Sequence, residues 1–424
     1  MRRIPFRRLS LLAVSSLALA ACGMHGQDNA EGEDTQTTAS AGTDYGYDTF
    51  SDDNLADSMA SSDGATSPDA IPDSQERPIM QAQVVLDRIG FGPGVIDGRM
   101  GMSTTNALTG FQIANNLAET GELDEATKAA LAKWDRIPAT RVVTIPANWA
   151  ELDYFAMPDE PEDQAKMKQL GYVSLDEKLA ERFHTTVDVL KELNPGGRPA
   201  GAPAPAAGAT GSASPTPAPT ASATASPRPS ASASGEGFAP QPGPQSFFKP
   251  GQQIRVPNIG GDRIEPGAIG ERGWQQTLAA LGVGSKQPEV DRIVVSKAGK
   301  TLKAYQGNKL VALFTVSSGS SEFPLPLGEW KILGEAYNPP YSYDPEVLGK
   351  DGGDSETYKL PPGPNSPVGV VWIDLSKEHY GIHGTPEPDT IGRAQSSGCV
   401  RLTNWDAARL AQMVSQDTQV IFEA

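Results

Sequence analysis

The sequence predicts a multidomain α+β protein with a small helical domain, a second module divided by a long insertion, and a C-terminal domain built mainly from strands. Three observations support this prediction. The length of 424 residues suggests roughly three domains. Two stretches, 23–76 and 198–245, hold few large apolar side chains and separate the apolar segments. The hydrophobic spacing is helical before residue 197 and becomes strand-like after residue 291.

The overall composition excludes several classes of protein. Lys and Arg number 35 against 52 Asp and Glu, and the net charge of −17 argues against a nucleic-acid surface, which needs clustered basic side chains. The two cysteines, Cys22 and Cys399, cannot form a disulfide framework. With four histidines and no His-Glu-x-x-His motif, we expect neither a metal site nor a cofactor.

Residues 1–22 have the pattern of a secretory signal, because a basic start precedes an apolar run that is too short to cross a bilayer. The run ends in Leu-Ala-Ala and Cys22, which resembles the lipobox of bacterial lipoproteins. The resemblance implies a lipid on Cys22 that anchors the protein to a cell-envelope membrane, facing the periplasm. Gly23, where an Asp often favours the inner membrane, indicates the outer membrane. The alternative is an ordinary signal peptide with a chance cysteine.

Residues 23–76 are expected to form a disordered acidic linker, since they bury too little apolar surface to offset the entropy of ordering. Residues 77–134 have apolar side chains at helical spacing, punctuated by Gly and Pro. They resemble the small three-helix peptidoglycan-binding domain in the patterns Gln83-x-x-Leu86, Gly90-Phe91, Asp97-Gly98-x-x-Gly101, Phe111-Gln112 and Leu123-Asp124-x-x-Thr127. The resemblance implies peptidoglycan binding, whereas the spacing alone predicts only a helical bundle.

Residues 140–257 form the second module, which the disordered stretch 198–245 is expected to interrupt. Residues 172–196 have helical apolar spacing closed by Asn-Pro, and residues 248–257 predict a turn and a strand. Together these segments resemble the two halves of a LysM domain, which implies glycan binding. Because residues 174–177 replace the Gly-Asp-Thr signature of that family, a structural spacer is the alternative.

The segment 288–424 predicts a mainly-β domain. Strands are expected over 293–296, 301–305, 310–316, 368–373 and 418–422. A helix is expected over 404–414, with Thr403 as its N-cap.

Candidate catalytic residues lie in two short segments of this domain. His379 and His383 are four residues apart in an expected strand, and alternation places both on one face with Gly381. Cys399 follows sixteen residues later, after Gly398. A thiol of ordinary pKa is mostly protonated at neutral pH, so a nucleophilic cysteine needs a histidine within hydrogen-bond reach. The backbone N–H groups of Gly398 and Cys399 are natural donors to the oxyanion of a tetrahedral intermediate.

The strings His-Gly-Thr, Ile-Gly and Ser-x-Gly-Cys-Val-Arg-Leu resemble the YkuD-type L,D-transpeptidase domain over roughly residues 291–424. The resemblance implies a two-step acyl transfer on peptidoglycan stem peptides. Cys399 would attack the L,D-peptide bond of a tetrapeptide stem and release D-alanine, and a diamino-acid amine of a second stem would then accept the acyl group. The resemblance assigns His383 as the general base and the Gly384 carbonyl as the group that orients its imidazole.

Further residues are candidate substrate contacts: Arg401, Ser397, Tyr337, Tyr341 and Tyr343. On a strand, Arg401 would share the face of Cys399, where it could bind a stem carboxylate or form a surface salt bridge. Ser397 stands where many family members have histidine. The segment 337–367 is either a lid over the donor site, carrying the three tyrosines, or an irregular surface excursion. His379 is expected to be a packed strand histidine.

The alternatives to cross-linking use the same nucleophile. Water as the acceptor would make an L,D-carboxypeptidase or endopeptidase, and a lysine of a wall-linked lipoprotein would make an attachment enzyme. A different class of function is a non-catalytic lipoprotein that anchors the membrane to peptidoglycan. The presence of Cys399, His383 and Gly398 argues against that class.

Overall fold

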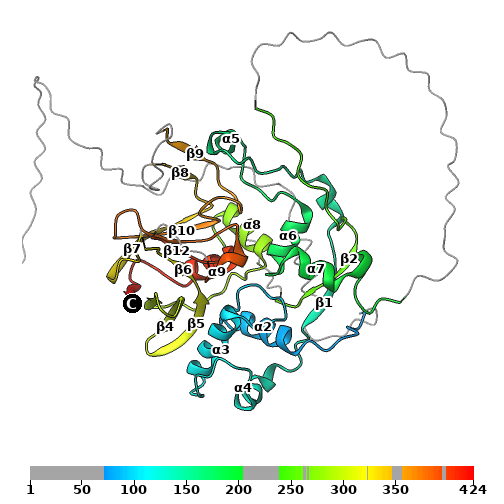
Figure 1. The fold of residues 1–424 in the computed structure, drawn as a ribbon, viewed down its shortest axis with the longest axis horizontal. Helices are drawn as coiled ribbons and strands as arrows, with labels where there is room; N and C mark the ends of the chain where they lie inside the picture. Colours follow the sequence, from blue (N-terminus) through cyan, green and yellow to red (C-terminus); the bar gives the residue numbers. More distant parts are fainter. Residues whose placement is uncertain are drawn as a thin grey trace, which may run out of the picture. The chain divides into compact units, whose positions relative to one another are not determined.

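A computed structural model of the chain describes residues 71–203, 238–260, 264, 267–321, 323–345, 356–393 and 398–424 (Figure 1). The expected signal with Cys22, most of the expected linker, the middle of the insertion, and Ser397 lie outside the described residues. The described residues all belong to one compact unit, which spans 42–424. None of the helices described in it is long and apolar enough to cross a bilayer.

The predicted helical bundle is confirmed. Its elements are α2 (Pro78–Arg88), α3 (Met102–Ala114), α4 (Glu125–Leu131) and the 3-10 turn η1 (Ala132–Trp134). Leu86 and Phe111 meet in its core. Two buried amides brace the loops, because Gln83 Nε2 donates to Thr104 Oγ1 at 3.0 Å and Gln112 Nε2 donates to Thr127 Oγ1 at 2.9 Å.

The two halves of the second module close on one core, although the insertion separates them in sequence. The elements are β1 (Thr140–Thr144), η2 (Ala147–Glu151), α5 (Pro161–Ala165), α6 (Leu175–Arg182), α7 (Val187–Leu193), η3 (Pro195–Gly197) and β2 (Gln253–Pro257). β1 and β2 pair antiparallel, with Thr140 opposite Pro257. Ser174 caps α6 and Thr186 caps α7, each by accepting from a backbone N–H three residues on.

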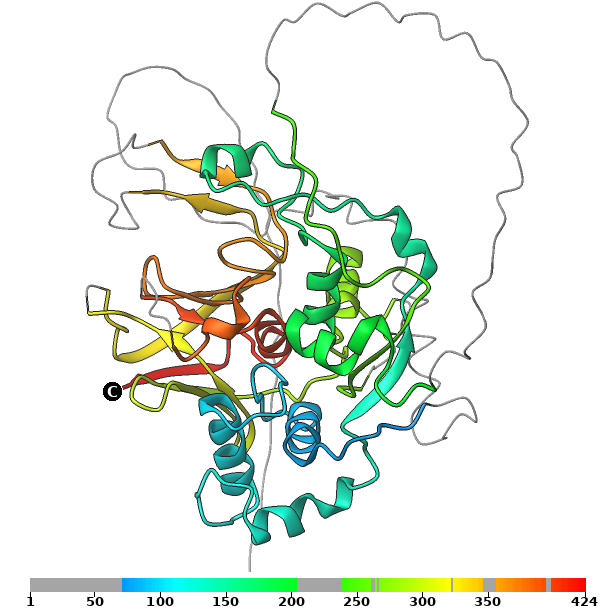
Figure 2. The same ribbon diagram turned by 45° about the vertical axis from the view of Figure 1, so that its right-hand side comes forward.

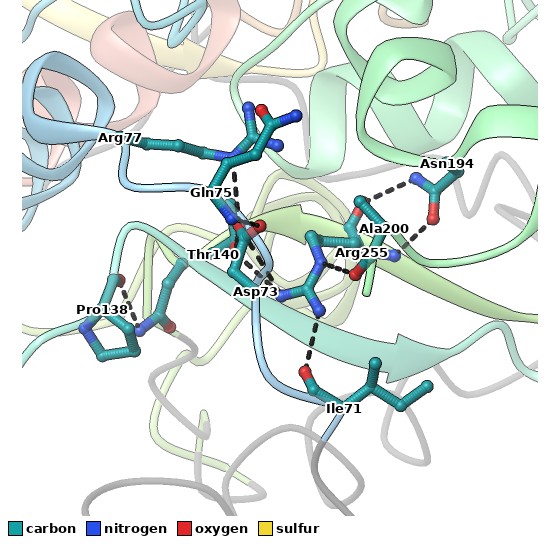
Figure 3. A network of polar contacts seen from close by, with 10 residues as sticks. Ile71, Asp73, Gln75, Arg77, Pro138, Thr140, Asn194, Ala200 and Arg255 are labelled. Carbon is teal, nitrogen blue, oxygen red and sulfur yellow. Dashed lines mark hydrogen bonds and ion pairs between the residues drawn. The ribbon is translucent and has the colours of Figure 1, made fainter. Parts of the chain in front are cut away.

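Arg255 of β2 joins several segments of this module (Figure 3). Its side chain is buried and donates to the carbonyl oxygens of Ile71 at 2.8 Å and Ala200 at 2.9 Å, and to Thr140 Oγ1 at 3.0 Å. Asn194, from the Asn-Pro that ends α7, bonds both the N–H and the C=O of Arg255. A buried guanidinium needs several acceptors, and here two backbone carbonyls and a threonine hydroxyl supply them, with the Asp73 carboxylate 3.8 Å away.

These contacts correct two expected boundaries. Residues 71–76 were expected in the linker, yet Ile71 and Asp73 are bonded to the second module. Residues 198–203 and 238–245 were expected in the disordered insertion, yet Ala200 accepts from Arg255, and the Gly243 N–H donates to the Tyr154 carbonyl at 2.9 Å. Local composition missed these segments because their contacts are polar, through backbone groups and the Asp73 carboxylate, and leave no apolar pattern.

A nine-stranded sheet forms the C-terminal domain, in the order β5-β4-β3-β13-β7-β10-β11-β12-β6. The strands are β3 (Arg292–Ser296), β4 (Thr301–Gln306), β5 (Lys309–Thr315), β6 (Ser317–Ser318), β7 (Gly328–Tyr337), β10 (Val371–Leu375), β11 (Gly381–His383), β12 (Val400–Arg401) and β13 (Gln419–Glu423). The helices α8 (Arg272–Leu281) and α9 (Asn404–Ala411) pack apolar side chains into the same core, and a turn, η4 (Pro388–Thr390), follows β11.

The expected strands are confirmed for β3, β4, β5 and β13, and the strand expected over 368–373 lies a few residues later, as β10. Thr403 caps α9 as predicted, by accepting from the Asp406 N–H at 3.1 Å. β7, the longest of the described strands, was not expected from the sequence. Most of its side chains are exposed or half-buried, so the segment lacks the apolar run that marked the other strands.

The segment 337–367 was expected to lack regular structure, and its described part corrects this. β8 (Tyr341–Tyr343) and β9 (Tyr358–Leu360) pair antiparallel. Leu360 packs with Met167 and Leu170 of the second module in a small cluster. The stabilising partners of this hairpin are therefore about 190 residues away in sequence, beyond the reach of local patterns.

The helical bundle covers the edge strand β5, as both ribbon views show (Figure 2). Phe91 forms a parallel bridge with Leu313, and the Gly92 N–H donates to the Leu313 carbonyl at 2.8 Å. Leu310 and Leu313 of β5 complete the core of the bundle. An edge strand exposes unpaired backbone groups, and this contact satisfies part of them.

Candidate active site

The parallel pair β11–β12 assembles the candidate site. Its register sets His383 opposite Arg401 and Ile382 opposite Val400. Cys399 immediately precedes β12, and its sulfur accepts a hydrogen bond from the Gly381 N–H. Side chains alternate along strands, so His383, Arg401 and Cys399 share one face. The structure thus brings together the predicted nucleophile, the predicted base and the predicted cation.

His383 is held in one tautomer. Its Nδ1 lies 2.7 Å from the Gly384 carbonyl oxygen, which can only accept, so Nδ1 carries the proton and Nε2 is left as the basic nitrogen. The ring is buried and stacks on Trp372, with centroids 5.5 Å apart. Burial lowers the pKa of His383 to about 4, which outweighs the opposing effect of the Gly384 hydrogen bond. The imidazole is therefore neutral at neutral pH, as a base must be.

Cys399 is half-buried, and its Sγ lies 3.6 Å from the His379 carbonyl oxygen. Burial raises the pKa of this thiol, while the Gly381 N–H and the charge of Arg401 act in the opposite direction. A raised thiol pKa and a lowered histidine pKa both favour the neutral pair. The arrangement accordingly suits proton removal during attack by a general base, not a preformed thiolate–imidazolium pair.

Gly398 occupies a position that only glycine fits. Its φ is +103°, and an added Cβ would lie 2.6 Å from the Tyr380 ring. The role of the Gly398 and Cys399 N–H groups as oxyanion donors stays a prediction.

Arg401 is half-buried next to the reacting groups. Its positive charge lowers the pKa of Cys399 and that of His383, and Glu387 is the acidic residue that acts most strongly on its own pKa. The register and the mutual effects of the Arg401 and Cys399 charges agree with the expectation that the two residues share a face, which stays a prediction. Arg401 is therefore not a plain surface residue.

The three tyrosines of the predicted lid fall in different places. Tyr337 ends β7 and stacks on Trp274 at 4.4 Å between centroids, so it contributes to packing there. Tyr341 lies within electrostatic range of Cys399: burial, followed by the charge of Cys399, raises its pKa. Tyr343 packs with Tyr341 in the small cluster around Leu360. The lid itself and its substrate contacts stay predictions.

His379 corrects the expectation of a packed strand histidine. It lies before β11, with φ +64°, and its side chain is two-thirds exposed, 3.5 Å from Glu378. The left-handed turn ends the alternation that was used to place it beside His383. What it contributes to the site is its backbone carbonyl.

Three residues escaped the sequence analysis: Trp372, which stacks on His383; Tyr380, which lies against Gly398; and Asn404, which contacts Gly384. Tyr380 sits between the two histidines and could have been noticed as an aromatic within the motif. Trp372 and Asn404 carried no local signal. Among the described residues, no group of three or more His, Cys, Asp or Glu side chains is placed to hold a metal ion.

Two family models match the chain. One, YkuD, is described as "L,D-transpeptidase catalytic domain" and matches residues 290–422, and the other is described as "Putative peptidoglycan binding domain" and matches residues 75–131. Among curated proteins, "Putative L,D-transpeptidase YkuD" of Bacillus licheniformis is 30% identical over 164 residues, which are 39% of this chain and 79% of that protein.

The Bacillus subtilis protein of the same name is 34% identical over 128 residues, which are 30% of this chain and 63% of that protein. Among solved structures, an L,D-transpeptidase from Mycobacterium smegmatis matches with 25% identity and a TM-score of 0.27. That match covers 32% of this chain and 59% of the solved chain. The chain therefore spans about three fifths of the length of these two proteins.

Proposed function

The chain belongs to the YkuD family of L,D-transpeptidases, and from that premise we propose that it cross-links peptidoglycan stem peptides through a thioester on Cys399. The observation that carries this proposal is the β11–β12 register, which sets His383, Arg401 and the thiol on one face while the Gly384 carbonyl fixes the basic nitrogen of His383. A base held by a third group beside a nucleophile is the geometry that acyl transfer requires.

In the first half-reaction, the Cys399 sulfur attacks the carbonyl carbon of the L,D-peptide bond of a tetrapeptide stem, and His383 Nε2 takes the thiol proton. The negative charge on the carbonyl oxygen is met by backbone N–H groups at Gly398 and Cys399. When the tetrahedral intermediate collapses, the C–N bond breaks and His383 returns the proton to the leaving amine of D-alanine. A thioester remains on Cys399.

In the second half-reaction, a side-chain amine of a neighbouring stem attacks the thioester, His383 takes a proton from that amine, and the thiolate leaves and is reprotonated. Water as the acceptor would give hydrolysis, and a lysine of a wall-linked lipoprotein would give attachment. Arg401 and Tyr341 stand beside the thiol, and we propose that they contact the donor stem.

The other parts of the chain fit action at the cell wall. The peptidoglycan-binding domain and the catalytic domain together support peptidoglycan as the substrate. We further propose that a lipid on Cys22 anchors the chain to an envelope membrane, facing the periplasm, and that the LysM-like module contacts glycan or spaces the two flanking domains. The lipobox-like end of the signal and the β1–α6–α7–β2 arrangement support these proposals.

The test is incubation of the full chain with purified tetrapeptide muropeptides, followed by mass spectrometry of the products and of the intact protein. Cys399→Ala is the matched control. We expect wild-type protein to gain the mass of the acyl group, to release D-alanine and to produce cross-linked dimers, and Cys399→Ala to do none of these.

Other outcomes would redirect the proposal. Loss of D-alanine that yields only tripeptide stems would show a hydrolase, or an attachment enzyme that lacks its protein acceptor. A wild-type chain that never acylates Cys399 would contradict the proposal and favour the wall-anchoring lipoprotein.

A further inference from the structure

A buried carboxylate of the second module reaches the back of the candidate active site. Glu181 lies on α6, and its Oε1 accepts from Asn404 Nδ2 at 2.7 Å. Asn404 is the first residue of α9 in the catalytic domain and is fully buried. The two residues are 223 positions apart in sequence. The second module therefore makes a specific polar contact inside the catalytic domain.

Asn404 uses both ends of its amide. Besides donating to Glu181, Nδ2 donates to the Pro364 carbonyl at 3.0 Å, and Oδ1 accepts from the Val370 N–H at 3.3 Å. These partners are all that a buried amide of this kind needs, and they fix the plane of the side chain. Without the Glu181 acceptor, one of the two N–H groups of the buried Asn404 amide would lose its hydrogen-bond partner.

Asn404 in turn contacts the backbone of Gly384, the residue whose carbonyl orients His383. An added Cβ on Gly384 would lie 2.2 Å from Asn404 Oδ1, and one on Gly369 would meet the same oxygen and the Gly384 backbone. No other residue fits at these two positions, so the amide and the Gly384 peptide are in direct contact. The carbonyl of that same Gly384 accepts from His383 Nδ1 at 2.7 Å.

We propose that Glu181 is a positioning residue for the reaction: through Asn404 it fixes the Gly384 carbonyl, and thereby the tautomer and orientation of His383. The inference rests on the proposed function of His383 as the base. It gives the second module a role in catalysis, separate from any contact that this module makes with glycan. A carbonyl displaced by about 1 Å would weaken the Nδ1 hydrogen bond and let the imidazole take the other tautomer, in which Nε2 cannot accept the thiol proton.

The protonation of the Glu181 carboxyl agrees with a role as a buried hydrogen-bond acceptor. Burial raises the pKa of its carboxyl to about 7, despite hydrogen bonds from Tyr172 and Asn404. A carboxyl that is partly neutral at neutral pH is well imitated by an amide. Glu181→Gln keeps an acceptor oxygen for Asn404, whereas Glu181→Leu keeps the volume and removes the acceptor.

Glu177 offers a matched control on the same helix. Its Oε1 accepts from Asn365 Nδ2 at 3.1 Å, so it too bonds an asparagine of the catalytic domain, and that Nδ2 also donates to the Gly171 carbonyl of the second module at 2.9 Å. Loss of a simple contact between modules would affect Glu177 and Glu181 variants alike. Loss of positioning would affect only Glu181 variants.

The experiment has two readouts on the full chain. The first is the side-chain ¹⁵N spectrum of histidine-labelled protein, which reports the tautomer of His383; the chain has four histidines, and His383→Gln assigns the signal. The second is the rate of Cys399 acylation by tetrapeptide muropeptide, separated into kcat and KM.

We expect wild type, Glu181→Gln and Glu177→Leu to hold the Nδ1-protonated tautomer and to acylate within about twofold of one another. Glu181→Leu should mix the tautomers and lower kcat at least about tenfold with little change in KM, because the substrate pocket is untouched. If Glu181→Leu does not fold, Glu181→Asp replaces it, since its shorter side chain withdraws the carboxylate from Asn404 and should shift the tautomer in the same direction.

Glu181→Leu or Glu181→Asp with the wild-type tautomer and kcat would overturn the inference, and so would equal losses in the Glu177 and Glu181 variants. Failure of the proposed function gives a different result, in which wild-type protein is not acylated at all while the tautomer of His383 still responds to Glu181.

Discussion

His383 and Cys399 depart from their ordinary pKa values in opposite directions, and both departures have burial as their largest cause. A low dielectric disfavours the charged form of each group, so the imidazole loses its proton more readily and the thiol keeps it. Between these two values lies a wide pH range in which the base is free and the nucleophile is neutral. Substrate attack then begins from an uncharged pair.

The pH dependence of acylation follows from the lowered pKa of His383. The base is neutral above a pKa of about 4 and is protonated as the pH falls through that value. We expect kcat/KM for the tetrapeptide to hold its neutral-pH level down to about pH 5 and to fall by half near pH 4. Initial rates in buffers of constant ionic strength would measure this. An acid limb centred near the ordinary histidine pKa of about 6.5 would contradict the burial argument.

Gly398→Ala should inactivate the enzyme without unfolding it. The added Cβ would strain a backbone with φ +103° and collide with the Tyr380 ring, which displaces the oxyanion donors. We expect kcat to fall at least about tenfold, measured by D-alanine release. Gly334→Ala is the control, because an added Cβ there meets nothing within 4 Å. Near-normal activity of Gly398→Ala would show that this backbone position does not shape the site.

At the scale of elements, the candidate catalytic residues lie in or next to very short strands, and longer strands form most of the sheet that supports them. β11 and β12 span three and two residues, yet their parallel register sets His383 opposite Arg401, with Cys399 immediately before β12. They are held from both sides, by β10 and by β6, and α9 begins directly behind them. Strands this short are marginal alone, so the flanking elements provide their stability.

The hydrogen bonds of Arg255 predict that this side chain stabilises the second module and holds residues 71–77 against β2. Arg255→Met would leave the carbonyls of Ile71 and Ala200 without their buried donor, which should cost about 2–3 kcal/mol of unfolding free energy. Urea unfolding measures this cost. Limited proteolysis should also cut faster within residues 71–77, since Arg255 ties that segment to β2. The exposed Arg136→Met serves as the control and should change neither quantity.

At the scale of the whole molecule, one buried polar cluster joins three parts of the chain. Asp87 of the helical bundle receives two hydrogen bonds, at 2.8 and 2.7 Å, from Arg409 of α9. His184, which follows α6, lies 3.2 Å from Asp87 and stacks on Trp405 with centroids 4.8 Å apart. Burial opposes ionisation of Asp87, but the charges of Arg409 and His184 outweigh it and hold the pKa of the carboxyl well below its usual range.

Asp87→Asn should therefore destabilise the protein strongly, because it removes the carboxylate that both terminal nitrogens of the buried Arg409 guanidinium contact and leaves the weaker ion pair with Asp406, at 3.6 Å. We expect a loss of about 3–5 kcal/mol in the free energy of unfolding, measured by urea denaturation. Arg99→Ala is the comparison, since it breaks an ion pair with Glu192 whose side chains are 69% and 63% exposed; it should cost at most about 1 kcal/mol.

A double variant separates charge from packing at the same place. Asp87→Leu with Arg409→Met removes both charges and keeps much of the volume, so it should recover most of the stability that Asp87→Asn loses. If the double variant is as unstable as Asp87→Asn, the cluster stabilises the protein through shape and hydrogen bonding to other groups, and the ion-pair explanation is wrong.

The sequence by itself predicted Cys399 as the nucleophile, His383 as the base, and most of the regular elements. Cys399 and His383 lie in short motifs whose residue types and spacing predict a thiol nucleophile with a base. Thr403 marks a helix start because an N-cap acts within three residues. Apolar spacing likewise identified the helical bundle and four of the strands. Each of these signals is local, since periodicity reports which face of a segment is apolar.

Only the tertiary structure decided which distant residues meet. Glu181 with Asn404, Asp87 with Arg409, and Arg255 with Ile71 are polar pairs that lie 184 to 322 residues apart. His379 shows the same limit within a motif, because one left-handed residue ended the alternation that had placed it. The physical reason is that burial of a polar group depends on a partner supplied by another segment, and a local pattern of side chains cannot name that partner.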